Sequence, residues 1–126
     1  PTAAARAACD WTAAARFLGE QPEQGHTVLT DVYQGPEILW RSGYRVVGGP
    51  YELAAAHRDT RRVMEGGEVE ARLALVRRAV DEVLLCRNDD SATGALALAL
   101  RRGSPPTDFQ PLPAPPGFVR YRVSPG

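Results

Sequence analysis

Residues 26–51 of the chain read HTVLTDVYQGPEILWRSGYRVVGGPY, and this stretch decides the fold. It predicts a strand over residues 27–32, a short helix that begins with the Gly-Pro-Glu sequence at residues 35–37, and a second strand over residues 45–49. We expect Gly43 to end the helix, because glycine readily takes the left-handed conformation that follows a last helical turn. In a sheet built from such units, ligands bind beside the carboxyl ends of the parallel strands.

Polar and aromatic side chains follow both predicted strands, so we expect a ligand-binding site where these strands end. The candidate ligand-binding residues are Asp31, Tyr33, Gln34, Glu37, Tyr51 and Arg58. For Asp31 the sequence leaves two roles open, an acid of the site or a cap of the following turn. The arginines at positions 41, 45, 58, 61 and 62 are either an anion site beside the second strand or, as we expect, a solvated face with local ion pairs.

Helical patterns predict further helices over residues 2–19, 52–66, 68–79 and 94–102. The helix over 68–79 is expected to pack against the core through one apolar face. That face consists of Val69, Leu73 and Val76, with Val80 just beyond the helix. Their spacings of four, three and four residues are those of one side of an amphipathic helix.

The remaining strands are predicted over residues 80–86 and 118–123. The first contains the apolar run Val83-Leu84-Leu85, which predicts a buried strand core. The second alternates, which is typical of a half-exposed edge strand. Six prolines between residues 104 and 117 predict an extended connection without regular structure. The order of elements predicts a Rossmann-like, three-layer α/β/α sandwich around a small, mainly parallel, four-stranded sheet.

Composition indicates one globular domain, residues 1–126, of which 44% are hydrophobic and 24% charged. The net charge is zero, so a nucleic-acid partner is not expected. No apolar run reaches the roughly 18 residues of a membrane span, and no signal-peptide pattern is present. All 15 basic residues are arginine, which indicates a GC-rich bacterial genome.

The sequence contains no complete set of reactive residues. His26 and His57 lack a neighbouring ligand at metal-binding spacing, and the single Gly35 is not a phosphate-binding motif. We therefore predict no catalytic residue, no metal and no cofactor. The two cysteines, Cys9 and Cys86, make no disulfide framework; the sequence leaves their bonding open and favours buried free thiols.

Three runs together resemble a known family of domains: residues 30–51, the sequence VDEVLLC at 80–86 and the closing VRYRV at 119–123. They resemble the soluble tail of bacterial polytopic membrane proteins similar to C-type glycosyltransferases (GT-C), the group that includes oligosaccharyltransferase catalytic subunits and protein mannosyltransferases. Oligosaccharyltransferases carry an acceptor-recognition motif, W-W-D-Y-G. Residues 30–35 are similar to it only loosely, without tryptophans and with two extra residues before the glycine.

The resemblance implies a non-catalytic domain at the periplasmic face of the inner membrane. Its partner would be the membrane-embedded remainder of the same protein, which would transfer sugar from a polyprenyl-phosphate carrier and hold the catalytic carboxylate. The domain would help to position the acceptor, with a glycan or a lipid-linked sugar as its ligand. Two alternatives stay open: a free-standing α/β module that binds a small ligand or a protein, and a small soluble enzyme.

Overall fold

The computed structural model describes residues 9–31, 35–48 and 54–124, and the side chain of Glu37 lies outside that description. Its strands form one five-stranded sheet in the order β2-β1-β3-β5-β4. The strands are β1 (Thr27–Leu29), β2 (Arg45–Val46), β3 (Glu82–Cys86), β4 (Phe109–Leu112) and β5 (Phe118–Val123). The helices are α2 (Trp11–Gly19), α3 (Gly35–Leu39), the 3-10 turn η1 (Trp40–Ser42), α4 (Ala54–Glu65), α5 (Glu68–Arg77) and α6 (Ala95–Arg101).

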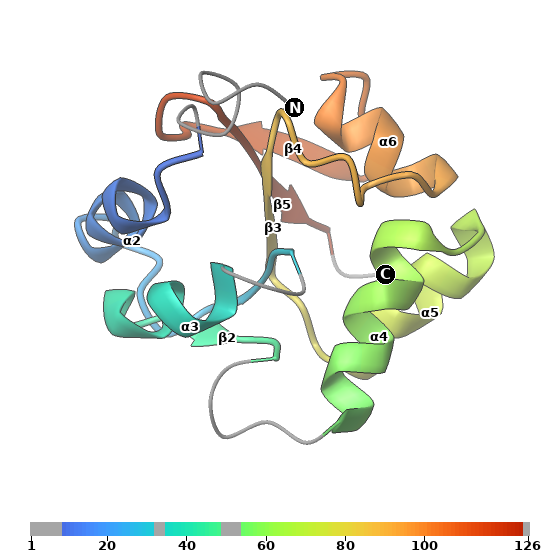
Figure 1. The fold of residues 1–126 in the computed structure, drawn as a ribbon, viewed down its shortest axis with the longest axis horizontal. Coiled ribbons are helices and arrows are strands. Elements are labelled where there is room, and N and C mark those ends of the chain that lie inside the picture. The colour runs from blue at the N-terminus through green and yellow to red at the C-terminus, as the bar shows by residue number, and fades with distance from the viewer. Residues whose placement is uncertain (1–8, 32–34, 49–53, 125–126) are drawn as a thin grey trace.

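Helices cover both faces of the sheet, as the sequence predicts. In Figure 1 the sheet is seen almost edge-on, with α2 and α3 on one side and α4, α5 and α6 on the other. Each side has its own apolar core, one centred on Trp11, Leu18 and Val28, the other on Leu29, Met64 and Leu85. Successive residues of β1 point to opposite faces and supply both cores, Val28 one and Leu29 the other, which is what a strand covered on both faces requires.

The sheet differs from the prediction in strand number and direction. It has five strands instead of four, and most of its paired residues are antiparallel: β1 runs parallel to β2 and β3 over short stretches, but β5 is antiparallel to both β3 and β4 over longer ones. The five residues between β4 and β5 are too few for a parallel crossover, which needs a dozen or more. The short connection therefore forces β4 and β5 to pair antiparallel.

The proline-rich segment contains a strand, so the prediction of no regular structure there was wrong. Strand β4 lies at the edge of the sheet and pairs with β5, with Pro111 opposite Tyr121. Proline is tolerated in edge strands, where one side of the backbone needs no partner. As a result β5 is an inner strand and not the predicted half-exposed edge, and its first four residues are all buried.

The orientation of α5 also contradicts the prediction. The helix buries the small side chains of Ala71 and Ala74 together with Leu75. The predicted core residues Val69, Leu73 and Val76 are 73%, 58% and 78% exposed, and of that set only Val80, beyond the helix, is buried. Spacing alone identified one apolar face of α5, but the packing uses the opposite, small-residue face.

One buried carboxylate joins α4 to α5. Asp59 of α4 is 1% exposed and accepts hydrogen bonds from Arg62, Arg77 and Arg78 at 2.6–3.1 Å. The hydrogen bonds from Arg77 above all, then those from Arg78 and Arg62, hold the pKa of Asp59 well below its ordinary value, although burial opposes them. Arg77 and Arg78, at the end of α5, reach across to α4 and fix the rotation of one helix against the other.

A disulfide joins Cys9, just before α2, to Cys86 at the end of β3. The two Cα atoms are 5.7 Å apart and the cysteines are 77 residues apart in the chain. The expectation of free thiols was wrong, because both cysteines of the chain are bonded. The bridge fastens the start of α2 to the central region of the sheet.

Breaking this bridge should destabilise the protein. For a closed loop of this length, loss of the cross-link raises the entropy of the unfolded chain and lowers the free energy of unfolding by about 4–5 kcal/mol. Urea unfolding with and without dithiothreitol measures the effect. The Cys9→Ala/Cys86→Ala variant is the control, because it should unfold at the lower midpoint whether or not the reductant is present. Equal midpoints for the oxidised and reduced native protein would contradict the bond.

Replacing Asp59 by asparagine should lower the free energy of unfolding at pH 7 by about 3–5 kcal/mol, because arginines are left facing a neutral group. The depressed pKa of the folded carboxyl means that its stabilisation is complete above the unfolded value near 3.8 and is lost as the pH falls. The difference in free energy of unfolding between the native protein and Asp59→Asn should therefore become smaller below about pH 4. Urea titrations at several pH values test this, with the exposed Asp90→Asn variant as control. A gap that stays constant down to pH 2 would contradict the role of the carboxylate.

Candidate functional site

The carboxyl ends of β1 and β2 meet α3 and α4 at one edge of the sheet. Asp31 follows β1, and its Oδ1 accepts a hydrogen bond of 3.0 Å from the backbone N–H of Gly35 at the start of α3. Of the two roles that the sequence leaves open, the structure shows the cap. An acidic oxygen in this position also suits the positive end of a helix.

The turn from β1 into α3 is closely packed, and this explains the glycine at position 35. A Cβ at Gly35 would lie 2.7 Å from Thr30 Cγ2 and 2.9 Å from the ring of Trp11. The backbone of α3 can therefore approach β1 and α2 only without a side chain here. Thr30 is fully buried, and its Oγ1 has no hydrogen-bond partner within the described residues.

Helix α4 brings His57 to the same edge. A Cβ at Gly48, which has a φ of 79°, would lie 3.4 Å from His57 Nδ1 and 3.9 Å from Pro36. The imidazole therefore lies over the end of the second predicted strand, close to the first turn of α3. The next residue, Arg58, is exposed, and it makes no ion pair within residues 9–31, 35–48 and 54–124.

The structure thus places some of the predicted site residues and leaves others aside. Asp31 and the His57–Arg58 pair belong to elements that meet at the predicted edge. Tyr33, Gln34 and Tyr51 lie outside the described residues, as does the side chain of Glu37. For all six candidate residues, Asp31 and Arg58 included, the ligand-binding role stays a prediction.

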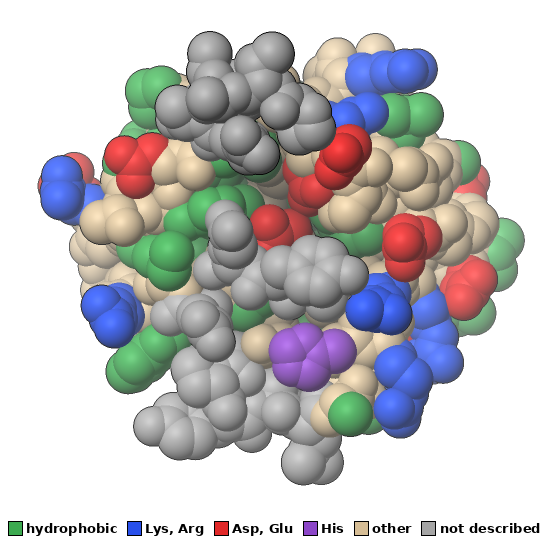
Figure 2. Space-filling view, viewed as in Figure 1, with side chains coloured by type: hydrophobic (Ala, Val, Ile, Leu, Met, Phe, Trp, Pro, Cys, Tyr) green, Lys and Arg blue, Asp and Glu red, His purple; other side chains and the backbone are tan. Residues whose placement is uncertain are grey.

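The arginines do not gather into one anion site. Arg41 lies on η1, on the α2 side of the sheet, whereas Arg58, Arg61 and Arg62 lie on α4, on the opposite side. Over α4 and α5, basic and acidic side chains are interspersed (Figure 2), and Arg62 pairs with Asp59 and approaches Glu70. The prediction of local ion pairs is confirmed for Arg62.

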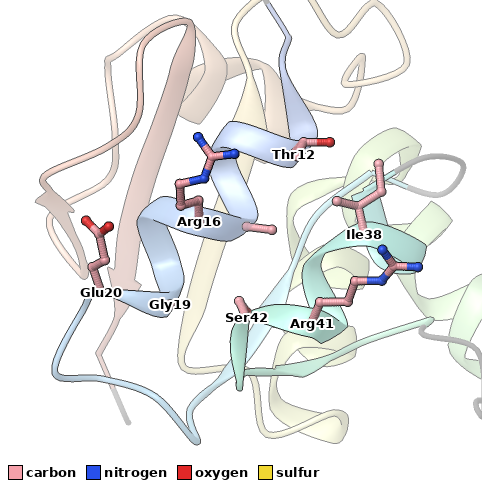
Figure 3. A pocket seen from close by; sticks show the side chains of 8 residues that line it. Thr12, Arg16, Gly19, Glu20, Ile38, Arg41 and Ser42 are labelled. Carbon is pink, nitrogen blue, oxygen red and sulfur yellow. The ribbon is translucent and has the colours of Figure 1, made fainter.

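A groove of about 580 Å³ lies between α2 and α3–η1 (Figure 3). Arg16 of α2 and Arg41 of η1 are its cations, and neither has a partner among the residues that the structure describes. In Figure 3 the two guanidinium groups point in different directions, and Glu20 lies on the same side of the groove as Arg16. The Ser42 hydroxyl is already used, donating to Leu39 O at 2.6 Å and accepting from Tyr44 N at 3.3 Å. The groove can contact an anion on either side but does not enclose one.

A buried ionic cluster, which the sequence pattern did not predict, lies at the opposite end of β1 and β3. Arg120 of β5 is 2% exposed and donates from Nε to Glu82 Oε1 at 2.6 Å and from Nη2 to Glu82 Oε2 at 3.1 Å. Tyr44 donates to the same carboxylate at 3.2 Å, and burial, then the Glu82 charge, raise the pKa of Tyr44 to about 12. A charged residue within the apolar run of β3 was the signal that a buried partner exists.

The remaining donors of Arg120 are also satisfied. Its Nη1 donates to Pro113 O at 3.0 Å, and its Nη2 also reaches Tyr44 Oη and Glu23 at 3.2 and 3.3 Å. His26 Nδ1 lies 3.5 Å from Glu82 Oε2, without hydrogen-bond geometry. Because every charged group in this cluster already has partners and little contact with water, we assign the cluster a structural role.

Comparison with known proteins gives a fold likeness. No protein-family model and no curated protein matches the chain. The structure is similar to the crystal structure of the C-terminal globular domain of an oligosaccharyltransferase from Archaeoglobus fulgidus, with a TM-score of 0.68 and 17% sequence identity, over 90% of this chain and 96% of that one. At this identity the likeness shows the fold alone. It confirms the fold that the sequence resemblance implies. The bacterial source stays a prediction.

Removing Glu82 alone should destabilise the protein more than removing the whole ion pair. Glu82→Leu removes the carboxylate that accepts two hydrogen bonds from the buried Arg120, and it should lower the free energy of unfolding by about 3–5 kcal/mol. The double variant Glu82→Leu/Arg120→Met removes the stranded charge and should lose less than Glu82→Leu alone. Urea unfolding measures both, with Arg122→Met, a half-exposed neighbour on β5, expected to stay within about 1 kcal/mol of the native protein. A double variant less stable than Glu82→Leu would contradict this assignment.

Proposed function

We propose that this chain is a non-catalytic extracytoplasmic domain of a membrane-embedded, glycosyltransferase-like protein and that it helps to position the acceptor. The observation that supports the proposal is the likeness of nearly the whole chain to the C-terminal globular domain of an oligosaccharyltransferase. In this proposal the sugar comes from a polyprenyl-phosphate carrier, and the membrane-embedded remainder of the same protein performs the transfer.

The disulfide supports an extracytoplasmic location. Cys9 and Cys86 are bonded, and disulfides persist in oxidising compartments such as the bacterial periplasm. Cytosolic thiols, in contrast, are kept reduced. Among the described residues no helix is long and apolar enough to cross a membrane, so in this proposal the membrane anchor belongs to another part of the protein.

The edge formed by the carboxyl ends of β1 and β2 is the proposed acceptor site. The capped turn at Asp31 gives this edge a fixed backbone, and His57 and Arg58 add polar groups from α4. An exposed arginine without an ion pair in the described part of the chain is available to an acceptor carboxylate or hydroxyl. The contributions of Tyr33, Gln34, Glu37 and Tyr51 to this site lie outside the described part of the chain and are expected from the sequence alone.

Kinetics of the intact membrane protein test the proposal. We expect Tyr33→Ala and Arg58→Ala to raise the KM for the acceptor about 5- to 10-fold, while kcat and the KM for the polyprenyl-linked donor stay unchanged. This pattern marks the loss of binding energy that ground state and transition state share. The measurement is transfer of labelled sugar at varied acceptor concentration, in membranes that contain the full-length protein.

Arg16→Ala/Arg41→Ala is the matched control, because it removes two unpaired arginines from the groove of Figure 3, between α2 and η1. It should leave the acceptor KM unchanged. If Arg16→Ala/Arg41→Ala raises the acceptor KM and the edge variants do not, the acceptor binds in the groove and not at the edge. A loss of kcat at constant KM in the edge variants would contradict a positioning role.

A further inference from the structure

An apolar stripe runs along the outer face of α5, formed by Val69, Leu73 and Val76, which we call the α5 stripe. These are three of the four large hydrophobic side chains that are exposed among the described residues, at 73%, 58% and 78%. They follow one another at spacings of four and three residues, so they lie on one side of the helix. Single exposed apolar residues need no explanation, but a contiguous exposed row indicates a contact surface.

A cavity of about 540 Å³ extends the apolar surface at the carboxyl-terminal end of the stripe. Val76 belongs to both, and the other apolar walls of the cavity include Leu75, Val80, Phe109 and Val123. The rim carries Arg72 and Asp108, which form an ion pair. A side chain that packs against Val76 therefore finds further apolar surface beside it.

The charges beside the stripe are arranged so that α5 complements itself. Turning by 100° per residue, the helix places Glu70 and Arg77 on the same flank of the stripe, with the acid near the amino end and the base near the carboxyl end. When two copies of such a helix lie antiparallel about a twofold axis, each flank faces its own copy in reverse order. The Glu70 of one copy then faces the Arg77 of the other, twice.

Glu70 and Arg77 are both exposed enough to form this ion pair. Glu70 is 56% exposed and only approaches Arg62, at 3.7 Å. Arg77 is 52% exposed; its Nε and Nη2 bind Asp59, and its Nη1 makes no hydrogen bond or ion pair within the described residues. A second carboxylate can therefore bind Arg77 without displacing Asp59.

We propose that the α5 stripe is the contact surface between two copies of this chain, which pair antiparallel with the twofold axis at Leu73. In that register Leu73 packs on Leu73 of the second copy, Val69 packs on Val76, and Glu70 binds Arg77. The position numbers in these pairs sum to 146, 145 and 147, so one alignment satisfies all three. The inference does not rest on the proposed function.

The expected dimer is weak. A helix of ten residues is only about 15 Å long, so the pairing buries less than the roughly 1,200 Å² of a standard stable interface. We expect a Kd on the order of 10⁻⁴ M, which corresponds to a complex that forms at high local concentration. Sedimentation equilibrium of the purified protein at about 10 µM to 1 mM, concentrations that bracket the expected value, measures this Kd.

Cysteine cross-linking tests the register. Leu73→Cys lies on the twofold axis and should link two copies under mild oxidation. Val69→Cys alone should not, because two copies of residue 69 would be about 12 Å apart along the helices, beyond disulfide reach. A mixture of Val69→Cys and Val76→Cys proteins should link. If Val69→Cys links alone as fast as Leu73→Cys, the pairing is unspecific or parallel and the proposal is wrong.

Charge variants test the flank. Glu70→Arg should raise the dimer Kd at least 10-fold, because it places arginines opposite Arg77 in both contacts. Glu20→Arg, the same exchange on α2 in the opposite helix layer, should leave the Kd unchanged. A protein that stays monomeric at 1 mM overturns the proposal. Binding of that monomer to anionic lipid vesicles, lost in Leu73→Asp, would identify the stripe as a membrane contact instead.

Discussion

The ion pair between Glu82 and Arg120 is the interaction on which the arrangement of the sheet depends. It connects β3 to β5, the two central neighbours, through two hydrogen bonds. Arg120 then reaches Tyr44 just before β2, Glu23 before β1 and the carbonyl of Pro113 just after β4. One guanidinium thus contacts residues in or beside all five strands. Because two buried charges are tolerated only when each is satisfied, an arrangement that separated β3 from β5 would leave Glu82 and Arg120 without each other in the core.

Strand β3 is held at both of its ends. Glu82 at its start belongs to the ionic cluster, and Cys86 at its end carries the disulfide to Cys9. This strand also lies between the parallel pair β1–β2 and the antiparallel pair β4–β5. The opposite ends of β1 and β2, where Asp31 caps α3, are away from the ionic cluster. The structural charges and the candidate acceptor edge therefore occupy different ends of the same strands.

The helix layer of α4, α5 and α6 follows another principle. Helices α4 and α5 approach closely because Ala71 and Ala74 are small, and Asp59 binds arginines of α5 across the contact. With its small side chains turned inward, α5 presents its large aliphatic residues to solvent. The exposed stripe is thus a consequence of how Asp59 and the alanines set the rotation of α5, and it is the surface that we propose to pair two copies.

The sequence by itself determined the elements formed by local chemistry. Gly-Pro-Glu at 35–37 and the left-handed Gly43 bound the α3–η1 unit as predicted, and apolar runs located β1, β2, β3 and β5. The location of the candidate edge also follows from the sequence, because it depends only on strands joined by a helix.

Tertiary structure decided the features that join distant residues. The strand at Phe109–Leu112 exists because β5 offers it a partner, despite Pro111. Arg120 is buried because Glu82, 38 residues away, receives it, and Cys9 is bonded because the fold brings it to Cys86. The inward face of α5 was decided by Asp59 on another helix. Periodicity identifies which residues share a face, but only the partner across the contact determines which face is buried.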